Sequence, residues 1–395
     1  MSRQRETSFS YGWAYGALMG WLLLWSVSAV QAEPYLAIRE GYKCSFCHVN
    51  QTGGGKRTGV VSAHADEWLK YPKDLFSDFE ARAPVTGQIV DGVSIGADFR
   101  GANITLFRDK PNAEGRVRNN TAFRPADSND FEISEASAYL EVNLIKDALT
   151  FYLDESFAPG SAFNRETFGL LTGFLPWNMY IKAGKFFPPY GFRLQDDAAF
   201  IRSRTGFNFT SPDTGVEVGL APGNAFLSVA VTNGTGVSRG ERIGKQVSLN
   251  GYYLFSDLPV VRNVWVGGSF AYNSLKGKDR TLYGFHTGLN LWRLTMLGEI
   301  DFIEDEQLPQ RASQFAGYGE INWLVCDWMN AKFAYDYFDP SRQRGDQALT
   351  RYSFGVEPFL SKFLQLRLFY RVYNGVPEKP QDNFDQLITE MHVFF

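Results

Sequence analysis

The chain has 395 residues, of which 44% are hydrophobic and 16% aromatic, and its net charge is −4. This length is enough for a sizeable core or one large barrel. The small net charge gives no reason to expect nucleic-acid binding.

The first 32 residues have the features of a secretory signal peptide. Arg3 and Arg5 precede an apolar run over about residues 13–27, and Val30-Gln31-Ala32 is a cleavage site of the small-x-small type. A membrane anchor is the alternative, but the apolar run is short for a span. The sequence therefore predicts cleavage before Glu33 and export. Beyond this signal no continuous apolar stretch reaches 18 residues, so any membrane span must be made of β-strands.

Cys44-Ser45-Phe46-Cys47-His48 has the attachment pattern of a c-type haem. Two thiols at this spacing can form thioethers to the two vinyl groups of the porphyrin, and the adjacent imidazole can then bind the iron as proximal ligand. A thioredoxin-like redox pair would need a βαβ setting, and a zinc site would need a second ligand cluster. The pattern favours one covalent haem c on Cys44, Cys47 and His48. Cys326 is then left over, as a thiol of no assigned role.

Residues 33–84 form a predicted haem segment that is partly helical. Gly53-Gly54-Gly55-Lys56-Arg57 lacks the phosphate-loop pattern and is interpreted as a flexible turn over the haem edge. Ser62 is a predicted cap for a short helix over 63–71, which carries His64. A segment of this size cannot bury a macrocycle alone, so the rest of the chain must cover it.

Residues 85–395 alternate with a period of two. Apolar Ala331, Phe333 and Tyr335 alternate with polar or small neighbours, as do Leu364 to Val372, a pattern typical of a transmembrane barrel with a polar lumen. A soluble β-sandwich is the alternative. Sixteen such runs start near residues 87, 131, 148, 162, 178, 214, 224, 245, 263, 280, 293, 313, 328, 350, 363 and 384. The sequence thus predicts an all-β fold, a 16-stranded antiparallel porin-like barrel whose lumen the haem segment plugs or caps.

Connections between the runs mostly alternate between long and short, as expected for extracellular loops and periplasmic turns. The exceptions are a longish turn at 256–262 and a short loop at 276–279. An even strand count puts both termini in the periplasm. The loop 188–213 carries Asp196 and Asp197, a pair that could hold a cation, although acidic pairs on loops are usually just solvated. The equivalent loop folds into the lumen in many porins.

The second iron ligand is less well indicated. His64 is the first candidate, so His48 and His64 are the predicted metal ligands, and His392 is a weaker candidate. His286 also falls on the inward face, whereas Met179, Met296, Met329 and Met391 fall on the lipid face. A five-coordinate iron stays open as well.

The whole chain resembles the fused outer-membrane cytochrome–porins of iron-oxidising bacteria. The resemblance rests on Pro34 to His48 (PYLAIREGYKCSFCH), on the porin-like stretch Gly184 to Gly191, and on the terminal Phe395, although the Gly53 to Arg57 run departs from the pattern. It implies an electron conduit across the bacterial outer membrane, between extracellular iron or another redox partner and a periplasmic cytochrome; with ferrous iron as donor the protein would act as an Fe(II) oxidase. The sequence leaves open the direction of electron flow. A diffusion porin with a haem gate or sensor, and a peroxidase with an open distal position, are the rival hypotheses.

Overall fold

The computed structural model describes residues 33–59, 87–108, 127–234, 244–275, 277–308, 312–343, 347–376 and 382–395. The strands are β1 (Gln88–Val90), β2 (Val93–Phe107), β3 (Ser128–Ile145), β4 (Leu149–Ala158), β5 (Phe163–Leu171), β6 (Tyr180–Phe186), β7 (Asp213–Leu220), β8 (Ala225–Thr232), β9 (Gln246–Phe255), β10 (Asn263–Leu275), β11 (Lys278–Leu291), β12 (Leu294–Asp305), β13 (Ala312–Cys326), β14 (Met329–Asp339), β15 (Leu349–Ser361), β16 (Leu364–Asn374) and β17 (Phe384–Phe394).

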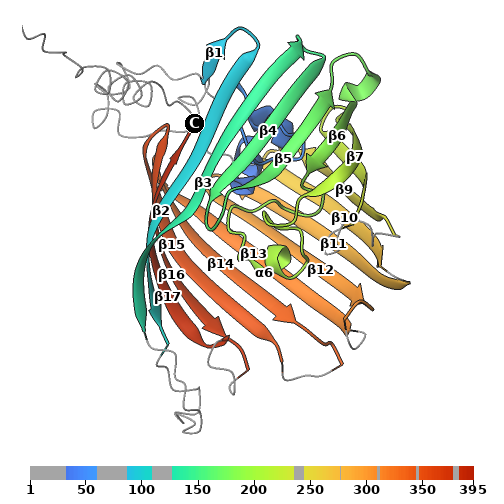
Figure 1. Ribbon diagram of the computed structural model, residues 1–395. Helices are drawn as coiled ribbons and strands as arrows, with labels where there is room; N and C mark the ends of the chain where they lie inside the picture. The colour runs from blue at the N-terminus through green and yellow to red at the C-terminus, as the bar shows by residue number, and fades with distance from the viewer. Residues whose placement is uncertain are drawn as a thin grey trace, which may run out of the picture.

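Strands β2 to β17 form one closed antiparallel barrel (Figure 1). Each strand pairs with the next along the chain, and β17 pairs with β2 from Asp385 opposite Phe107 to Phe394 opposite Asp98, which closes the ring. The short strand β1 adds a hairpin to β2. The predicted 16-stranded antiparallel barrel is therefore confirmed. The predicted starts agree with the observed strands to within three residues, except that the run near residue 87 begins with the β1 hairpin.

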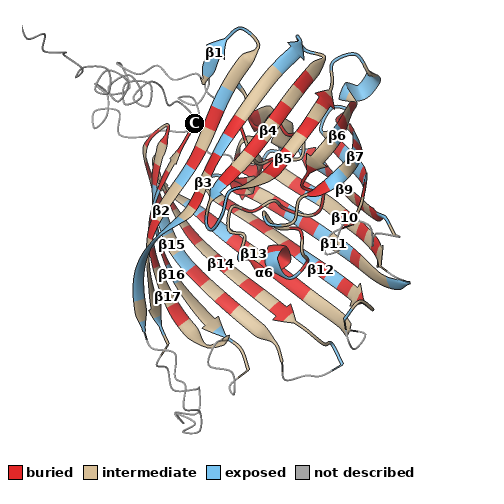
Figure 2. Ribbon diagram, in the orientation of Figure 1, coloured by how far each residue is buried: buried red, intermediate tan, exposed pale blue. Residues whose placement is uncertain are grey.

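The burial pattern of the wall is inverted relative to a water-soluble protein (Figure 2). In β14 the inward residues Asn330, Lys332 and Asp336 are buried, and in β16 the outward Leu366 and Leu368 are exposed. An outer surface of exposed apolar side chains around a polar lumen is what a lipid-facing barrel requires. The alternation predicted from the sequence is confirmed in both strands.

Short turns gather at the end of the barrel where the chain ends. They join β3 to β4, β7 to β8, β13 to β14 and β15 to β16 through no more than four residues each. The longer 256–262 turn between β9 and β10 lies at the same end, as the sequence predicted. The connection 187–212 starts from the opposite end and carries the helix α6 (Phe200–Ser203), which packs against β12, β13 and β14 inside the barrel (Figure 1). The expectation that this loop folds into the lumen is confirmed.

The N-terminal described segment also lies in the lumen. Its helices are α2 (Pro34–Glu40), which packs against β10, β11 and β12, and the one-turn α3 (Cys44–Cys47). In the part of the chain that the structure describes, no helix is long and apolar enough to cross a membrane. The predicted signal peptide, the helix over 63–71 and His64 lie outside the described residues.

Candidate functional site

Cys44, Cys47 and His48 lie together inside the barrel. Cys44 and Cys47 begin and end the single turn of α3, so their side chains share one face of the helix, and neither forms a disulfide. His48 caps the turn by donating its backbone N–H to the carbonyl of Cys44 at 3.0 Å. Cys47 and His48 are only 5% and 6% exposed. The barrel supplies the cover that a fifty-residue segment could not.

The glycine run forms a tight turn that brings the chain back to His48. Gly53, Gly54 and Gly55 all have positive φ, a conformation that favours glycine, and a backbone bridge then pairs Arg57 with His48. The carbonyl of Gly55 lies 3.3 Å from Nδ1 of the imidazole. The turn predicted at this position is confirmed, but it is packed against its surroundings, because a Cβ on Gly55 would lie 2.1 Å from the hydroxyl of Tyr152.

Buried polar contacts hold this turn to the barrel wall. The Asn50 amide donates to both carboxylate oxygens of Glu166 at 2.8 and 3.0 Å and accepts from Lys182 Nζ at 3.0 Å. Lys56 donates to Glu141 at 2.9 Å, and its backbone N–H donates to the hydroxyl of Tyr152 at 2.8 Å. Because buried polar groups keep their partners, these contacts fix the segment in one place.

The start of the segment is fixed by a buried charge cluster. The Nζ of Lys332 lies 2.6 Å from Glu33, 3.3 Å from Glu357 and 3.8 Å from Glu320. Lys43 donates to the carbonyls of Ala221 and Gly223 in the β7–β8 turn at 2.9 and 2.7 Å. The N-terminal segment is therefore held at one end by β14 and β15 and further along by the β7–β8 turn, so it crosses the lumen.

An apolar pocket opens beside the two thiols. Aromatic side chains from the 187–212 loop and from β8, β9 and β10 line it, together with Cys44, Cys47 and His48: Phe192, Phe226, Tyr252 and Trp265. Tyr252 stacks on Trp265 with ring centroids 3.6 Å apart and accepts a 3.4 Å hydrogen bond from the backbone N–H of Cys44. A lining that is mostly aromatic, with a few polar groups, is typical of ligand pockets.

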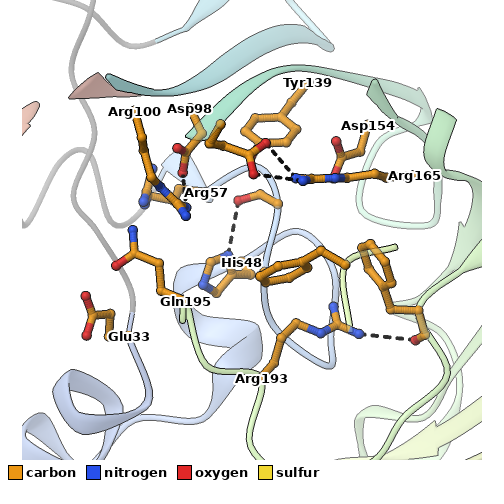
Figure 3. A pocket seen from close by; sticks show the side chains of 15 residues that line it. Glu33, His48, Arg57, Asp98, Arg100, Tyr139, Asp154, Arg165, Arg193 and Gln195 are labelled. Carbon is orange, nitrogen blue, oxygen red and sulfur yellow. Dashed lines mark hydrogen bonds and ion pairs between the residues drawn. The ribbon is translucent and has the colours of Figure 1, made fainter. Parts of the chain in front are cut away.

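A second pocket lies on another side of His48 and is charged (Figure 3). Four arginines and four acids line it: Arg57, Arg100, Arg165, Arg193, Glu33, Asp98, Glu135 and Asp154. Arg165 pairs with Glu135 at 2.7 Å and Arg100 with Asp98 at 3.0 Å. His48 lines both pockets and so lies where the apolar and the charged spaces meet.

The environment of the thiols distinguishes between the hypotheses for the motif. Burial raises the pKa of Cys47 to about 12 and also raises that of Cys44. A reactive dithiol needs a lowered pKa, so this site does not favour a redox pair. Among the described residues, no three His, Cys, Asp or Glu side chains cluster as a metal site. By contrast, two thiols, an adjacent imidazole oriented through Nδ1, and an apolar pocket fit the needs of a c-type haem.

The other candidate histidines have different partners. His286 is fully buried, accepts from the indole N–H of Trp265 at 3.0 Å and lies 2.9 Å from Asn250 Oδ1. His392 Nε2 lies 3.2 Å from Asp98, and its Nδ1 lies 3.2 Å from Gln195 and from Gln365. Neither ring lines the two pockets described above.

The two acidic residues of the 187–212 loop hold the loop in place: Asp196 ties it to the barrel wall, and Asp197 ties one part of the loop to another. Asp196 lies 2.9 Å from both Arg351 and Arg371, while Asp197 accepts the backbone N–H of Phe209. Burial alone would raise the pKa of Asp196, but Arg351 and Arg371 hold it below its usual range. The carboxylates that the sequence offered for a cation are thus bound by protein groups.

The aromatic wall and the arginines of the charged pocket were missed by sequence reasoning. Tyr252 is 208 residues from Cys44 in the chain, and its inward position follows only from the closed register of the barrel. The inward parity of β9 and β10 was the available signal, since it places Tyr252 and Trp265 on the lumen face. The alternation shows that these two side chains face the lumen, but it does not give their position along the barrel axis, which decides whether they contact the haem segment.

No known protein family and no curated protein matches the sequence. Solved structures do match. OmpT of Vibrio cholerae with loop L8 deleted is 13% identical, with a TM-score of 0.56 over 77% of this chain and 99% of that chain. The high-pH structure of OprB from Pseudomonas putida is 8% identical, with a TM-score of 0.59 over 77% and 94% of the two chains. An anion-selective porin from Comamonas acidovorans is 12% identical, with a TM-score of 0.51 over 77% and 99%. This chain therefore has the fold of a 16-stranded porin-like barrel.

Proposed function

We propose that this chain is an electron conduit of the bacterial outer membrane, in which the barrel holds one covalently attached c-type haem within its lumen. The observation that carries the proposal is that Cys44, Cys47 and His48 lie together inside the barrel beside an aromatic pocket, with Cys47 and His48 buried and Cys44 partly buried. A motif used only as a tether would not need this cover. The short turns and both termini of the mature chain would face the periplasm.

Each group would have a defined role. Cys44 and Cys47 would hold the porphyrin through thioethers, and His48 would bind the iron through Nε2, oriented by the Gly55 carbonyl near Nδ1. Phe192, Tyr252 and Trp265 would exclude water from the ring. When bound, the haem supplies a one-electron ferric–ferrous couple whose potential depends on axial ligation and burial. His64 stays the first candidate for the distal ligand.

Electron balance sets what the partners must do. An extracellular ferrous ion gives up one electron and becomes ferric, and a periplasmic carrier such as a cytochrome takes up the same electron. The barrel wall would insulate the path from lipid, while the loops would give access from outside. Electron export would use the same residues in the opposite direction, with an extracellular acceptor.

A second candidate, a diffusion porin gated by the N-terminal segment, is favoured by the likeness to porins of known structure, one of them an anion-selective porin. Single-channel recording on the full chain separates the two. An electron conduit should have a low ion conductance, because Glu33, Asn50 and Lys56 hold the segment to the wall and the segment blocks the lumen. A chain lacking residues 33–84 should then conduct far more. Large conductance in the intact protein, unchanged by that deletion, would favour the diffusion porin.

A further inference from the structure

Within the described residues, two of the four arginines that line the charged pocket form no ion pair. Arg100 and Arg165 have theirs in Asp98 and Glu135. Arg57 and Arg193 form no ion pair with any residue that the structure describes. The four arginines of the pocket (Figure 3) thus fall into two pairs, one already bound to carboxylates of the protein and one that is not.

Arg57 ends the glycine-rich run and has no role in the proposed function. Its side chain is 7% exposed, its Nε has no hydrogen-bond partner among the described residues, and its guanidinium lies 4.5 Å from the centroid of the Phe394 ring. Burial lowers the pKa of this guanidinium, and the nearby Asp98 carboxylate offsets that effect only in part. An ion kept in this state is costly unless an anion compensates it.

Arg193 reaches the pocket from the opposite element, the 187–212 loop. In the described part of the chain it donates only to backbone carbonyls, those of Gly53 and Phe187, and its guanidinium lies 5.0 Å from the Phe187 ring. Gly54 contacts this side chain closely, since a Cβ there would lie 2.9 Å from Arg193 Cδ. The glycine run thus holds Arg193 next to His48.

From this geometry we infer that Arg57 and Arg193 bind a pair of carboxylates in the charged pocket, and that these are the two propionates of the haem. The inference rests on the proposed function. A porphyrin has an apolar vinyl edge and an anionic edge, and His48 lies between an apolar pocket next to the thiols and a charged one beyond it. Arginine forks suit carboxylates because two N–H groups can donate in parallel.

The test compares Arg57→Gln, Arg193→Gln and the control Arg280→Gln in holoprotein carrying its haem. Arg280 pairs with Asp305 elsewhere in the lumen and lines neither pocket. Each pocket variant should shift the ferric–ferrous equilibrium toward ferric iron about tenfold, or about 59 mV for one electron. Each should also move the propionate bending band in the resonance Raman spectrum. Arg280→Gln should change neither readout.

The variant Arg57→Lys distinguishes the effect of the positive charge from that of the guanidinium hydrogen bonds. It should restore most of the potential, because the charge is kept, but not the Raman band, because the guanidinium fork is lost. Unchanged Raman bands in both Gln variants would overturn the inference and leave the proposed function standing. Added succinate should not affect the wild-type potential, and a succinate-dependent potential would mean that a free anion fills the pocket instead, which also overturns it. Wild-type protein without covalent haem would overturn the proposed function itself.

Discussion

The imidazole Nδ1 of His48 lies 3.3 Å from the carbonyl oxygen of Gly55. A hydrogen bond at Nδ1 sets the tautomer and orientation of a histidine that binds iron through Nε2. The contact exists because three successive glycines turn the chain with positive φ. The orientation of the proposed ligand thus depends on a turn seven residues away.

The first prediction concerns this turn. Gly55→Ala adds a Cβ 2.1 Å from the Tyr152 hydroxyl at a φ of +66°, so the backbone must shift at a cost of about 1–3 kcal/mol. We expect lower covalent haem occupancy and an altered visible spectrum. Gly59→Ala is the matched control, because no described atom other than those of its chain neighbours lies within 4 Å of its Cβ position, and its φ is ordinary. Equal occupancy in both variants would contradict the role assigned to the turn.

The second prediction concerns the anchor of the haem segment. Lys332→Met leaves Glu33, Glu320 and Glu357 without their shared cation, and breaking a buried pair from one side costs about 3–5 kcal/mol. Release of the segment should raise single-channel conductance and open it to proteolysis. Lys146→Met, at an exposed turn, should behave like wild type. An unchanged conductance in Lys332→Met would show that this cluster does not hold the segment.

The third prediction concerns acid stability of the 187–212 loop. The pKa of Asp196 is depressed in the folded state, so its pairs with Arg351 and Arg371 contribute fully above the usual Asp value of 3.8. That contribution is lost as the pH falls through the folded pKa. Asp196→Asn should lower stability by about 1.5–3 kcal/mol near neutral pH. Thermal unfolding in detergent should show that the stability difference between wild type and Asp196→Asn shrinks below pH 3.8. A difference that does not depend on pH would contradict the stabilising role of the Asp196 ion pairs.

The fourth prediction concerns the axial ligands. His286 and His392 are bonded to Trp265 and Asp98 and line neither pocket. His286→Gln and His392→Gln should therefore keep the haem spectrum and its low-temperature electron paramagnetic resonance signals, whereas His48→Gln should change both. Loss of the low-spin signal in His392→Gln would instead identify that residue as the distal ligand.

The sequence predicted the barrel well and the site only in part. Alternation in β14 and β16 follows directly from lipid on one side and water on the other, so strand positions could be read from single residues. The pattern of Cys44, Cys47 and His48 likewise predicts covalent haem attachment from local sequence alone. The walls of the pocket could not be read in this way, because Tyr252 and Arg193 reach the motif only through the barrel register and the inward loop. These are long-range contacts that no local pattern encodes.

The most direct test of the account is an anaerobic absorption spectrum of the purified protein, recorded before and after ferrous iron is added. Denatured protein should retain its haem, because Cys44 and Cys47 would hold it covalently. Sharp reduced c-type bands should grow when ferrous iron is added to the folded protein. A haem reduced by dithionite but not by ferrous iron would contradict the iron donor. A polypeptide with no covalent haem would contradict the conduit altogether.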